Sequence, residues 1–179
     1  LDGTDVKISI EGFHNNGMTT EIHKAINGGE TRQKYSRFVP LQKYIFKDFD
    51  TPLKRSKGPI TSMEGMIGGN NADGEALLWS YERLKQRPEK RKLMLVLSDG
   101  HPRSAGCSGA TMMNISEYTV KMAKKIEADP DVELFSIGIN SGAVRNYYRD
   151  YEILTNINDL SGAVLNKLSA HLTGRKLRV

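Results

Sequence analysis

The stretch Arg-Lys-Leu-Met-Leu-Val-Leu-Ser-Asp-Gly, residues 91–100, decides the fold class. Its five consecutive apolar residues do not alternate with polar ones, which is typical of a strand buried on both faces of a parallel sheet. The run stops at Ser98, so we expect Asp99 at the carboxyl end of a central strand. Ligands of open α/β sheets bind at this edge. The alternative is that Asp99 only caps a loop.

Strand and helix patterns alternate along the chain. Apolar runs predict strands at 6–13, 41–49, 93–97, 132–139 and 151–155. Helical spacing predicts helices from 73 to near 88, at 114–128 with Asn114 as the cap, at 143–149 and at 159–172. Glycines and prolines predict long loops over 14–37 and 50–72. We therefore expect a single α/β domain over 1–179, with a doubly wound, mostly parallel sheet and helices on both faces.

The composition is typical of a soluble protein. The chain has 179 residues, a formal net charge of +5 at pH 7, 38% hydrophobic residues and 26% charged residues. No apolar stretch is long enough to span a membrane, so we expect no membrane contact. Basic and aromatic residues are not interleaved, so we expect no nucleic-acid partner. The single cysteine, Cys107, cannot form an internal disulfide, which favours a reducing compartment, the cytoplasm.

Several kinds of catalytic or cofactor site are not supported by the motifs. No Gly-x-Gly-x-x-Gly string follows a strand, and no phosphate-binding lysine loop is present. No Gly-x-Ser-x-Gly elbow occurs, and Cys107 has no histidine placed beside it. His14, His23, His101 and Cys107 could be considered as zinc ligands, but they lack the usual ligand spacing.

Oxygen-bearing side chains at the strand ends are the remaining candidates. Asp99 follows one strand, and Asn71 and Asp73 lie in the loop that leads into the first long helix. Carboxylates and other oxygen groups are the ligands that Mg²⁺ prefers, so these residues are a candidate Mg²⁺ site. The alternative for Asp73 is a helix N-terminal residue stabilised by the helix dipole.

The chain resembles a von Willebrand factor A domain, and more narrowly the carboxyl-terminal region of the T subunit of aerobic cobaltochelatase. The resemblance is dense over residues 73–172. It depends on the order of these strings: Asp73-Gly74-Glu75-Ala76-Leu77, Tyr81-Glu82-Arg83-Leu84, Arg87-Pro88-Glu89, Leu97-Ser98-Asp99-Gly100 with Pro102, Val132-Glu133-Leu134, Ile137-Gly138-Ile139, Tyr147-Tyr148-Arg149 and Leu160-Ser161-Gly162-Ala163.

The resemblance implies a metal-ion-dependent adhesion site built from three parts. Asp99 matches the aspartate after the fourth strand of the family. Asn71 or Asp73, with Asp73 favoured, occupies the region of a second-loop threonine. The first part, an Asp-x-Ser-x-Ser loop, is missing from the sequence. We therefore expect that the family's first strand, which is central, lies before Leu1, that the domain is N-terminally truncated, and that its metal site is incomplete in this chain.

The function that the resemblance implies is protein interaction without catalysis by this chain. The domain would act with an AAA+ ATPase subunit and a large chelatase subunit in cobalt insertion for cobalamin biosynthesis. Exposed sheet edges leave homo-oligomer formation open. One alternative is an A-type adaptor of an unrelated AAA+ system, in a toxin, phage or stress response. Another is a small enzyme that uses Asp99 with Mg²⁺ in phosphate chemistry.

Overall fold

The computed structural model describes residues 6–15, 41–66, 69–103 and 110–173. The chain divides into two compact units. Unit 1 comprises Leu1–Ser80 and Pro102–Thr119, and unit 2 comprises Tyr81–His101 and Val120–Val179. Each unit contains a sheet of its own.

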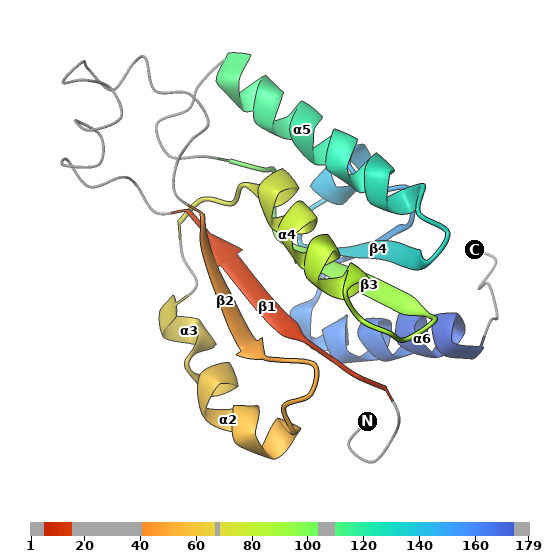
Figure 1. Cartoon of the computed structure of the whole chain (residues 1–179). Coiled ribbons are helices and arrows are strands. Elements are labelled where there is room, and N and C mark those ends of the chain that lie inside the picture. The colour runs from red at the N-terminus through yellow and green to blue at the C-terminus, as the bar shows by residue number, and fades with distance from the viewer. Residues whose placement is uncertain (1–5, 16–40, 67–68, 104–109, 174–179) are drawn as a thin grey trace, which may run out of the picture. The chain divides into compact units, whose positions relative to one another are not determined.

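Strands and helices follow one another along the described chain as labelled in Figure 1. Unit 1 begins with the strands β1 (Ile10–His14) and β2 (Gln42–Lys47), and the helices α2 (Leu53–Thr61) and α3 (Met63–Met66) follow them. The later elements are α4 (Asp73–Lys85), β3 (Lys92–Ser98), α5 (Ala110–Glu127), β4 (Val132–Ile139), η2 (Ala143–Asn146), β5 (Tyr151–Leu154), η3 (Ile157–Asp159) and α6 (Leu160–Thr173).

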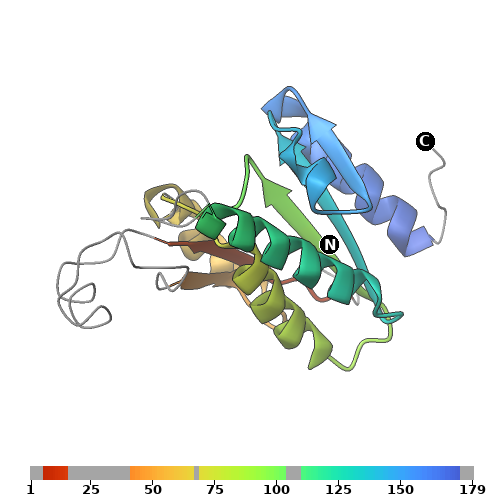
Figure 2. The same cartoon turned by 90° about the horizontal axis from the view of Figure 1, so that it is seen from above.

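The sheet of unit 2 is parallel, with the strand order β3-β4-β5. β3 pairs with β4 from Lys92 opposite Val132 to Ser98 opposite Gly138. Within this unit, α6 covers one face of the sheet and the carboxyl-terminal part of α5 lies on the other, as Figures 1 and 2 show. Alternation of strands and helices gives this arrangement because a parallel neighbour requires a crossover connection. The predicted α/β fold class is confirmed.

Burial within this sheet differs from the prediction. β4 is the inner strand, and six of its eight residues are buried. β3 has only one buried residue, Val96, and Leu97 is 46% exposed. The prediction that the run at 93–97 is a central strand buried on both faces is therefore wrong for the described sheet, because β3 pairs there on one side only. An apolar run does not show how many neighbours a strand has.

The core of unit 2 lies between the sheet and α6. Phe135 and Ile137 of β4 are fully buried, and Leu154 and Ala163 complete the buried cluster. Four partly buried side chains pack around it: Leu93, Leu95, Leu160 and Val164. The β3 residues at this face have odd numbers, as expected when alternate side chains of a strand point to opposite faces. Hydrophobic burial thus fixes which face of β3 meets α6.

The sheet of unit 1 is a two-stranded antiparallel pair, β1 and β2. One face lies against α4, where the Ser80 hydroxyl donates to the Glu11 carboxylate at 2.7 Å and Lys43 Nζ lies 5.0 Å from the centre of the Trp79 ring. On the other face, a Cβ at Gly12 would lie only 2.6 Å from the ring of Phe46. Glycine therefore lets this aromatic ring lie directly on β1.

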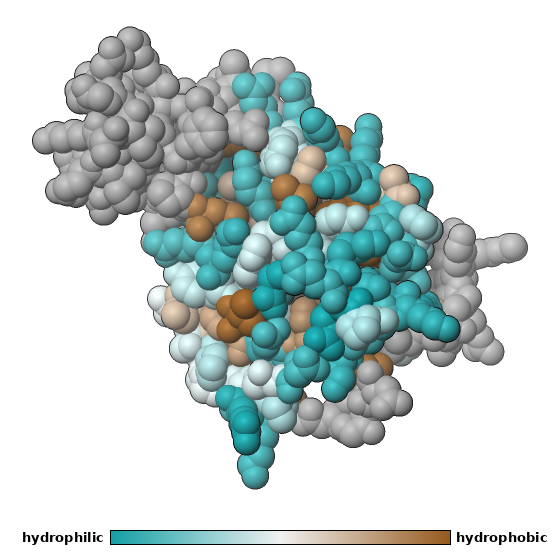
Figure 3. Space-filling view, viewed as in Figure 1, coloured by the Kyte–Doolittle hydropathy of each residue, from teal (hydrophilic) through white to brown (hydrophobic). Residues whose placement is uncertain are grey.

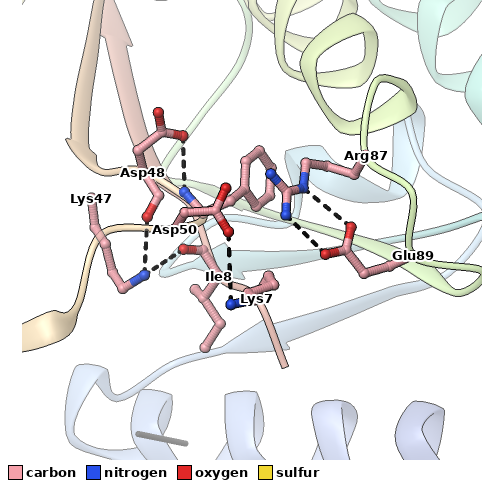
Figure 4. Close-up of polar contacts among 8 residues, drawn as sticks. Lys7, Ile8, Lys47, Asp48, Asp50, Arg87 and Glu89 are labelled. Atoms are coloured by element: carbon pink, nitrogen blue, oxygen red, sulfur yellow. Dashed lines mark hydrogen bonds and ion pairs between the residues drawn. The ribbon is translucent and has the colours of Figure 1, made fainter. Parts of the chain in front are cut away.

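The end of β2 is held by lysine contacts, drawn in Figure 4. Lys47 Nζ is buried and donates to the backbone oxygens of Ile8 at 2.7 Å and Asp48 at 3.1 Å. Lys7 forms an ion pair of 3.7 Å with Asp50. β2 is exposed at Gln42 and Lys43 and buried at Phe46 and Lys47, in agreement with the predicted partly exposed strand.

Two helices lie where the sequence predicts a loop over 50–72. α2 includes Pro59, and α3 follows after a single turn residue, Ser62. Gly58 and Pro59 favoured the loop prediction because glycine and proline are poor helix formers. The helix nevertheless forms: Pro52 stands immediately before its first residue, Ser56 is buried, and α2 contacts β2 in unit 1. Tertiary packing here outweighs local propensity.

The predicted loop over 14–37 lies outside the described residues from position 16 onward. α5 begins at Ala110, so the prediction of Asn114 as its cap is wrong. The predicted helix at 143–149 is a short 3-10 helix, η2. The strands near 6–13, 41–49, 132–139 and 151–155 and the final helix are confirmed within a few residues.

The connection from α4 to β3 is stabilised by Glu89. Arg87 donates to the Glu89 carboxylate from Nε at 3.1 Å and from Nη2 at 2.9 Å (Figure 4). Lys92 Nζ donates to the Glu89 backbone oxygen at 2.5 Å. The helix ends at Lys85, three residues before Pro88, as expected from the exclusion of proline and its predecessor from helices.

Hydrophilic side chains cover most of the described surface in Figure 3, and hydrophobic ones form small separate groups there. None of the helices in the described ranges combines the length and the apolarity that crossing a membrane requires.

Candidate functional site

Asp99 directly follows the last residue of β3, so it lies at the carboxyl end of the parallel sheet of unit 2. The residue is exposed. No described residue donates a hydrogen bond to its carboxylate or forms an ion pair with it. Its acceptor capacity is therefore available to a ligand, within the part of the chain that the structure describes.

The backbone around Asp99 forms a local turn. The Ser98 hydroxyl lies 3.1 Å from the Gly100 oxygen and 3.5 Å from the Gly100 nitrogen. A side chain that bonds to the backbone two residues further on is typical of serine at the end of a strand. Asp99 is therefore the middle residue of a turn in which Ser98 and Gly100 contact each other.

A second contact reaches this loop from the chain segment after β4. The Nδ1 atom of His101 lies 2.7 Å from the hydroxyl of Tyr147, and the two rings meet edge to face. Tyr147 is only 8% exposed and directly follows η2. Both residues belong to unit 2, so the contact ties the Asp99 loop to the carboxyl end of β4 within that unit.

Asn71 and Asp73 lie together in unit 1. Asp73 is the first residue of α4 and is only 3% exposed. Asn71 Nδ2 donates to Asp73 Oδ1 at 2.8 Å. An acidic residue in the first turn of a helix is stabilised by the helix dipole, so the structural alternative for Asp73 is compatible with this position.

The sequence did not reveal the polar residues that surround this pair in unit 1. Asn15, which follows β1 and is fully buried, exchanges backbone hydrogen bonds with Asn70 at 2.7 and 3.2 Å. Its side-chain Nδ2 donates to the Arg103 oxygen at 3.4 Å. Arg103 in turn donates its backbone N–H to the Asn71 oxygen at 2.8 Å. An asparagine just after a predicted strand was the available signal, because such residues often end strands with polar contacts.

The structure therefore brings Asn71 and Asp73 together and places Asp99 in the other unit. Arg103 belongs to unit 1 and follows Asp99 by four residues in the chain. The backbone bond from Arg103 to Asn71 joins two segments of unit 1.

The donor types agree with a hard cation. Mg²⁺ commonly binds one or two carboxylates and completes its shell with water or other oxygen groups. Asp99 offers one carboxylate with no described partner, and the Asn71–Asp73 pair offers further oxygens. Across the described ranges, no three or more His, Cys, Asp and Glu side chains cluster in a way that would hold a metal ion. Asp99 belongs to unit 2 and the Asn71–Asp73 pair to unit 1, so each is described by itself.

Two residues of the zinc site considered from the sequence, His14 and His101, lie in the part of the chain that the structure describes. His101 contacts Tyr147, and His14 Nε2 lies 3.0 Å from the hydroxyl of Tyr44. The two histidines belong to different units, and His23 and Cys107 lie outside the described residues.

Three described side chains with shifted pKa values, Tyr81, Lys85 and Asp129, contact one another at the amino end of the unit 2 sheet. Tyr81 donates to Asp129 at 2.6 Å, and Lys85 Nζ lies 2.8 Å from the same carboxylate. The hydrogen bonds from Lys85 and Tyr81 hold the pKa of Asp129 well below its usual range. Asp129 stands shortly before β4, whereas Asp99 follows the end of β3. This group therefore stabilises the fold and is separate from the candidate site.

A family model for the VWA domain of the cobalamin biosynthesis protein CobT matches residues 1–174 of the chain. No solved structure matches the chain significantly. The family match agrees with the parallel sheet of unit 2, with its flanking helices and with the resemblance seen in the motif strings. On this evidence the chain belongs to the family of VWA domains of the cobalamin biosynthesis protein CobT.

Proposed function

We propose that this chain is a non-catalytic, metal-dependent interaction domain of a cobaltochelatase T-type subunit. In this proposal it acts with an AAA+ ATPase subunit and a large chelatase subunit that inserts cobalt during cobalamin biosynthesis. The proposal depends on one observation above all: Asp99 is exposed at the carboxyl end of a parallel sheet, and its carboxylate has no described partner.

Binding is favoured over catalysis by the surroundings of Asp99. A catalytic carboxylate needs a second group that gives or takes a proton or orients a nucleophile. The nearest such group along the chain, His101, is engaged through Nδ1 with Tyr147. His14 and His101, the two histidines whose side chains the structure describes, each contact a tyrosine hydroxyl, whereas nucleophilic catalysis would require a serine, threonine or cysteine side chain there.

In this proposal Asp99 of unit 2 holds the metal ion, and Asn71 and Asp73 of unit 1 are further candidate metal residues because they carry oxygens of the type that Mg²⁺ prefers. An acidic side chain of a partner protein can complete the coordination shell of a bound Mg²⁺ as a further ligand. The role of Asp99 is then to supply the negative charge that retains the ion at the rim of the sheet. The role of the Asn71 amide is to fix the orientation of the Asp73 carboxylate through the 2.8 Å bond.

The partners follow from the family and from this chemistry. A carboxylate that binds one side of an ion leaves the other side of the ion open to a ligand from a second protein. A site of this kind suits an adaptor between subunits. The AAA+ subunit would supply ATP-driven movement, and the large subunit would carry out metal insertion. Cobalt is a substrate of that assembly, whereas Mg²⁺ is the proposed resident ion of this domain.

The test compares Asp99→Ala with Asp159→Ala. Asp159 is also an exposed aspartate of unit 2, but it lies in η3 and serves as the matched control. In the presence of Mg²⁺, we expect Asp99→Ala to weaken binding of the AAA+ subunit by at least about tenfold, or ~1.4 kcal/mol. Circular dichroism melting should remain unchanged, because Asp99 makes no described contact.

Equal affinity of the wild-type protein and Asp99→Ala for the AAA+ subunit would contradict the proposed site. Equal losses in Asp99→Ala and Asp159→Ala would show a general charge effect and would count against it as well.

A further inference from the structure

We infer that His101 and Tyr147 form a clamp that positions the Asp99 loop for metal-dependent binding. The inference rests on the proposed function, because it assigns these two residues to the same site. His101 and Tyr147 are positioning residues. Neither is required as a metal ligand, and both act by holding the loop that carries Asp99.

Within the described part of unit 2, the position of the Asp99 loop depends on its own side-chain contacts, since the bonded Arg103 that follows belongs to unit 1. The bonds between Ser98 and Gly100 join neighbours in the chain, so they shape the turn without fixing its direction relative to the sheet. Asp99 itself has no described partner that would anchor it. In the described part of unit 2, His101 provides the loop's side-chain hydrogen bond to a distant part of the chain, 46 residues away in Tyr147.

The geometry of the clamp favours a well-defined position. The 2.7 Å distance between Nδ1 and the hydroxyl is short for a hydrogen bond. The rings meet at 81° with their centres 5.9 Å apart, an arrangement that aromatic rings prefer. One polar contact and one ring contact together restrict the rotation of the His101 side chain and thereby the backbone beside Asp99.

Tyr147 is a rigid anchor. Its backbone N–H donates to the Val144 oxygen at 3.1 Å, and Val144 is almost fully buried. Its ring meets that of the buried Tyr148 edge to face, with centres 6.4 Å apart. A Cβ at Gly138 would lie 2.8 Å from Val144 Cγ2, so glycine allows the segment before Tyr147 to lie directly on β4. The clamp therefore connects the Asp99 loop to the best-buried strand of unit 2.

Either tautomer of His101 can make the contact with Tyr147. The tyrosine hydroxyl donates to a bare Nδ1 in one tautomer and accepts from Nδ1–H in the other. The loop is held in each case. The clamp therefore acts through position and not through charge.

The experiment measures the Mg²⁺ concentration at which half of the AAA+ subunit is bound. Tyr147→Phe keeps the ring and removes the hydroxyl. We expect the half-maximal Mg²⁺ concentration to rise about three- to tenfold. The variant populates the binding-competent loop position less often, and its apparent affinity for Mg²⁺ falls in proportion to the population of that position. Binding at saturating Mg²⁺ should reach the wild-type level. A purely structural defect would instead lower the maximum binding.

His101→Phe provides a second variant that keeps a ring and removes the bond. We expect it to shift the half-maximal Mg²⁺ concentration as Tyr147→Phe does. The double variant should shift it no further than either single change, because residues of one contact are not additive.

Tyr44→Phe is the matched control. Its hydroxyl pairs with His14 in unit 1 at 3.0 Å, so the change removes a Tyr–His contact of the same chemistry. We expect the half-maximal Mg²⁺ concentration to stay at the wild-type value in this variant. Amide hydrogen exchange over residues 98–101 should rise several-fold in Tyr147→Phe and remain at the wild-type rate in Tyr44→Phe.

The outcomes separate the clamp from the proposed function. If Asp99→Ala loses Mg²⁺-dependent binding while Tyr147→Phe and His101→Phe keep the wild-type half-maximal concentration, the clamp is wrong and the metal site stands. If binding of the AAA+ subunit depends neither on Mg²⁺ nor on Asp99, both proposals are overturned.

Discussion

Asp129 is a single residue that joins two segments of unit 2. Its carboxylate accepts from the Tyr81 hydroxyl at 2.6 Å and pairs with Lys85 at 2.8 Å. Its other oxygen accepts from the backbone of Asp131 at 2.9 Å. Lys85 also lies 3.2 Å from the Asp131 carboxylate, and these hydrogen bonds raise the pKa of Lys85. The end of α4 is thereby held against the turn before β4.

Replacing this carboxylate gives a prediction with a defined pH dependence. The hydrogen bond from Lys85, and then that from Tyr81, lowers the pKa of Asp129 in the folded state. A lowered pKa contributes stability above the unfolded-state value of about 4, and this stability is lost as the pH falls below it toward the folded-state value. Asp129→Asn should therefore lower the Tm at pH 7, and its difference from wild type should shrink at pH 3.

Thermal melts between pH 7 and pH 3 check this prediction, with Asp159→Asn as the control. Asp159 is exposed, and we expect its variant to follow the wild-type curve. A difference between Asp129→Asn and wild type that stays constant over this pH range would argue against the ion pair as its source.

At the scale of single residues, the sequence predicts those residues whose role follows from their place in the chain. Asp99 is predictable because it ends an apolar run, and Asp73 because it begins a helix. The His101–Tyr147 contact was not predictable from the sequence, because the two residues are 46 positions apart and meet only after β3 and β4 have paired.

Two glycines differ in the space around them, and this difference gives a prediction about stability. At Gly138, a Cβ would overlap the backbone oxygen of Ser141 and lie 2.8 Å from Val144 Cγ2. Gly138→Ala should therefore destabilise the protein by about 1–3 kcal/mol, as expected for overpacking of a rigid site. Gly162 in α6 has no atom near the equivalent position, so Gly162→Ala should be stabilising by up to about 1 kcal/mol through helix propensity.

Urea unfolding of both variants measures these changes in the free energy of unfolding. Opposite signs are expected, and the denaturant slopes should stay equal to that of wild type. A Gly138→Ala variant as stable as wild type would contradict the close approach of the segment after β4.

Elements were predictable where local pattern and packing agree. The pattern of apolar and polar residues predicts the type and order of β4, β5 and α6. Each of these elements buries at least one apolar face. α2 was missed because its proline and glycine favour a loop, whereas its contact with β2 is a tertiary property. The exposure of Leu97 was missed because an apolar run does not show that a strand lies at an edge.

At the scale of the whole molecule, we expect the edge of β3 to be a route to self-association. Among the described strands, β3 pairs with β4 and has no partner on its other side. An edge strand presents unpaired backbone groups that can pair with another chain. Leu97, which is 46% exposed, adds apolar surface at this strand. We expect the chain to associate with itself through β3 at high concentration.

Leu97→Lys should reduce this association, because a charged side chain opposes pairing at a sheet edge. Sedimentation velocity over a range of concentrations measures the effect. Leu165→Lys serves as the control, since Leu165 is 60% exposed on α6 and is not part of a strand. A wild-type chain that sediments as a monomer at all concentrations would contradict an open edge at β3.

The most direct test of the metal-dependent interaction combines Asp99→Ala with metal removal. Affinity for the AAA+ subunit is measured for wild type and Asp99→Ala, each with Mg²⁺ and with a chelator. If Asp99 acts through the ion, chelation weakens wild type at least about tenfold and leaves Asp99→Ala at the same low affinity in both conditions. Independent losses from the mutation and from chelation would contradict the account, as would a wild-type affinity that chelation does not change.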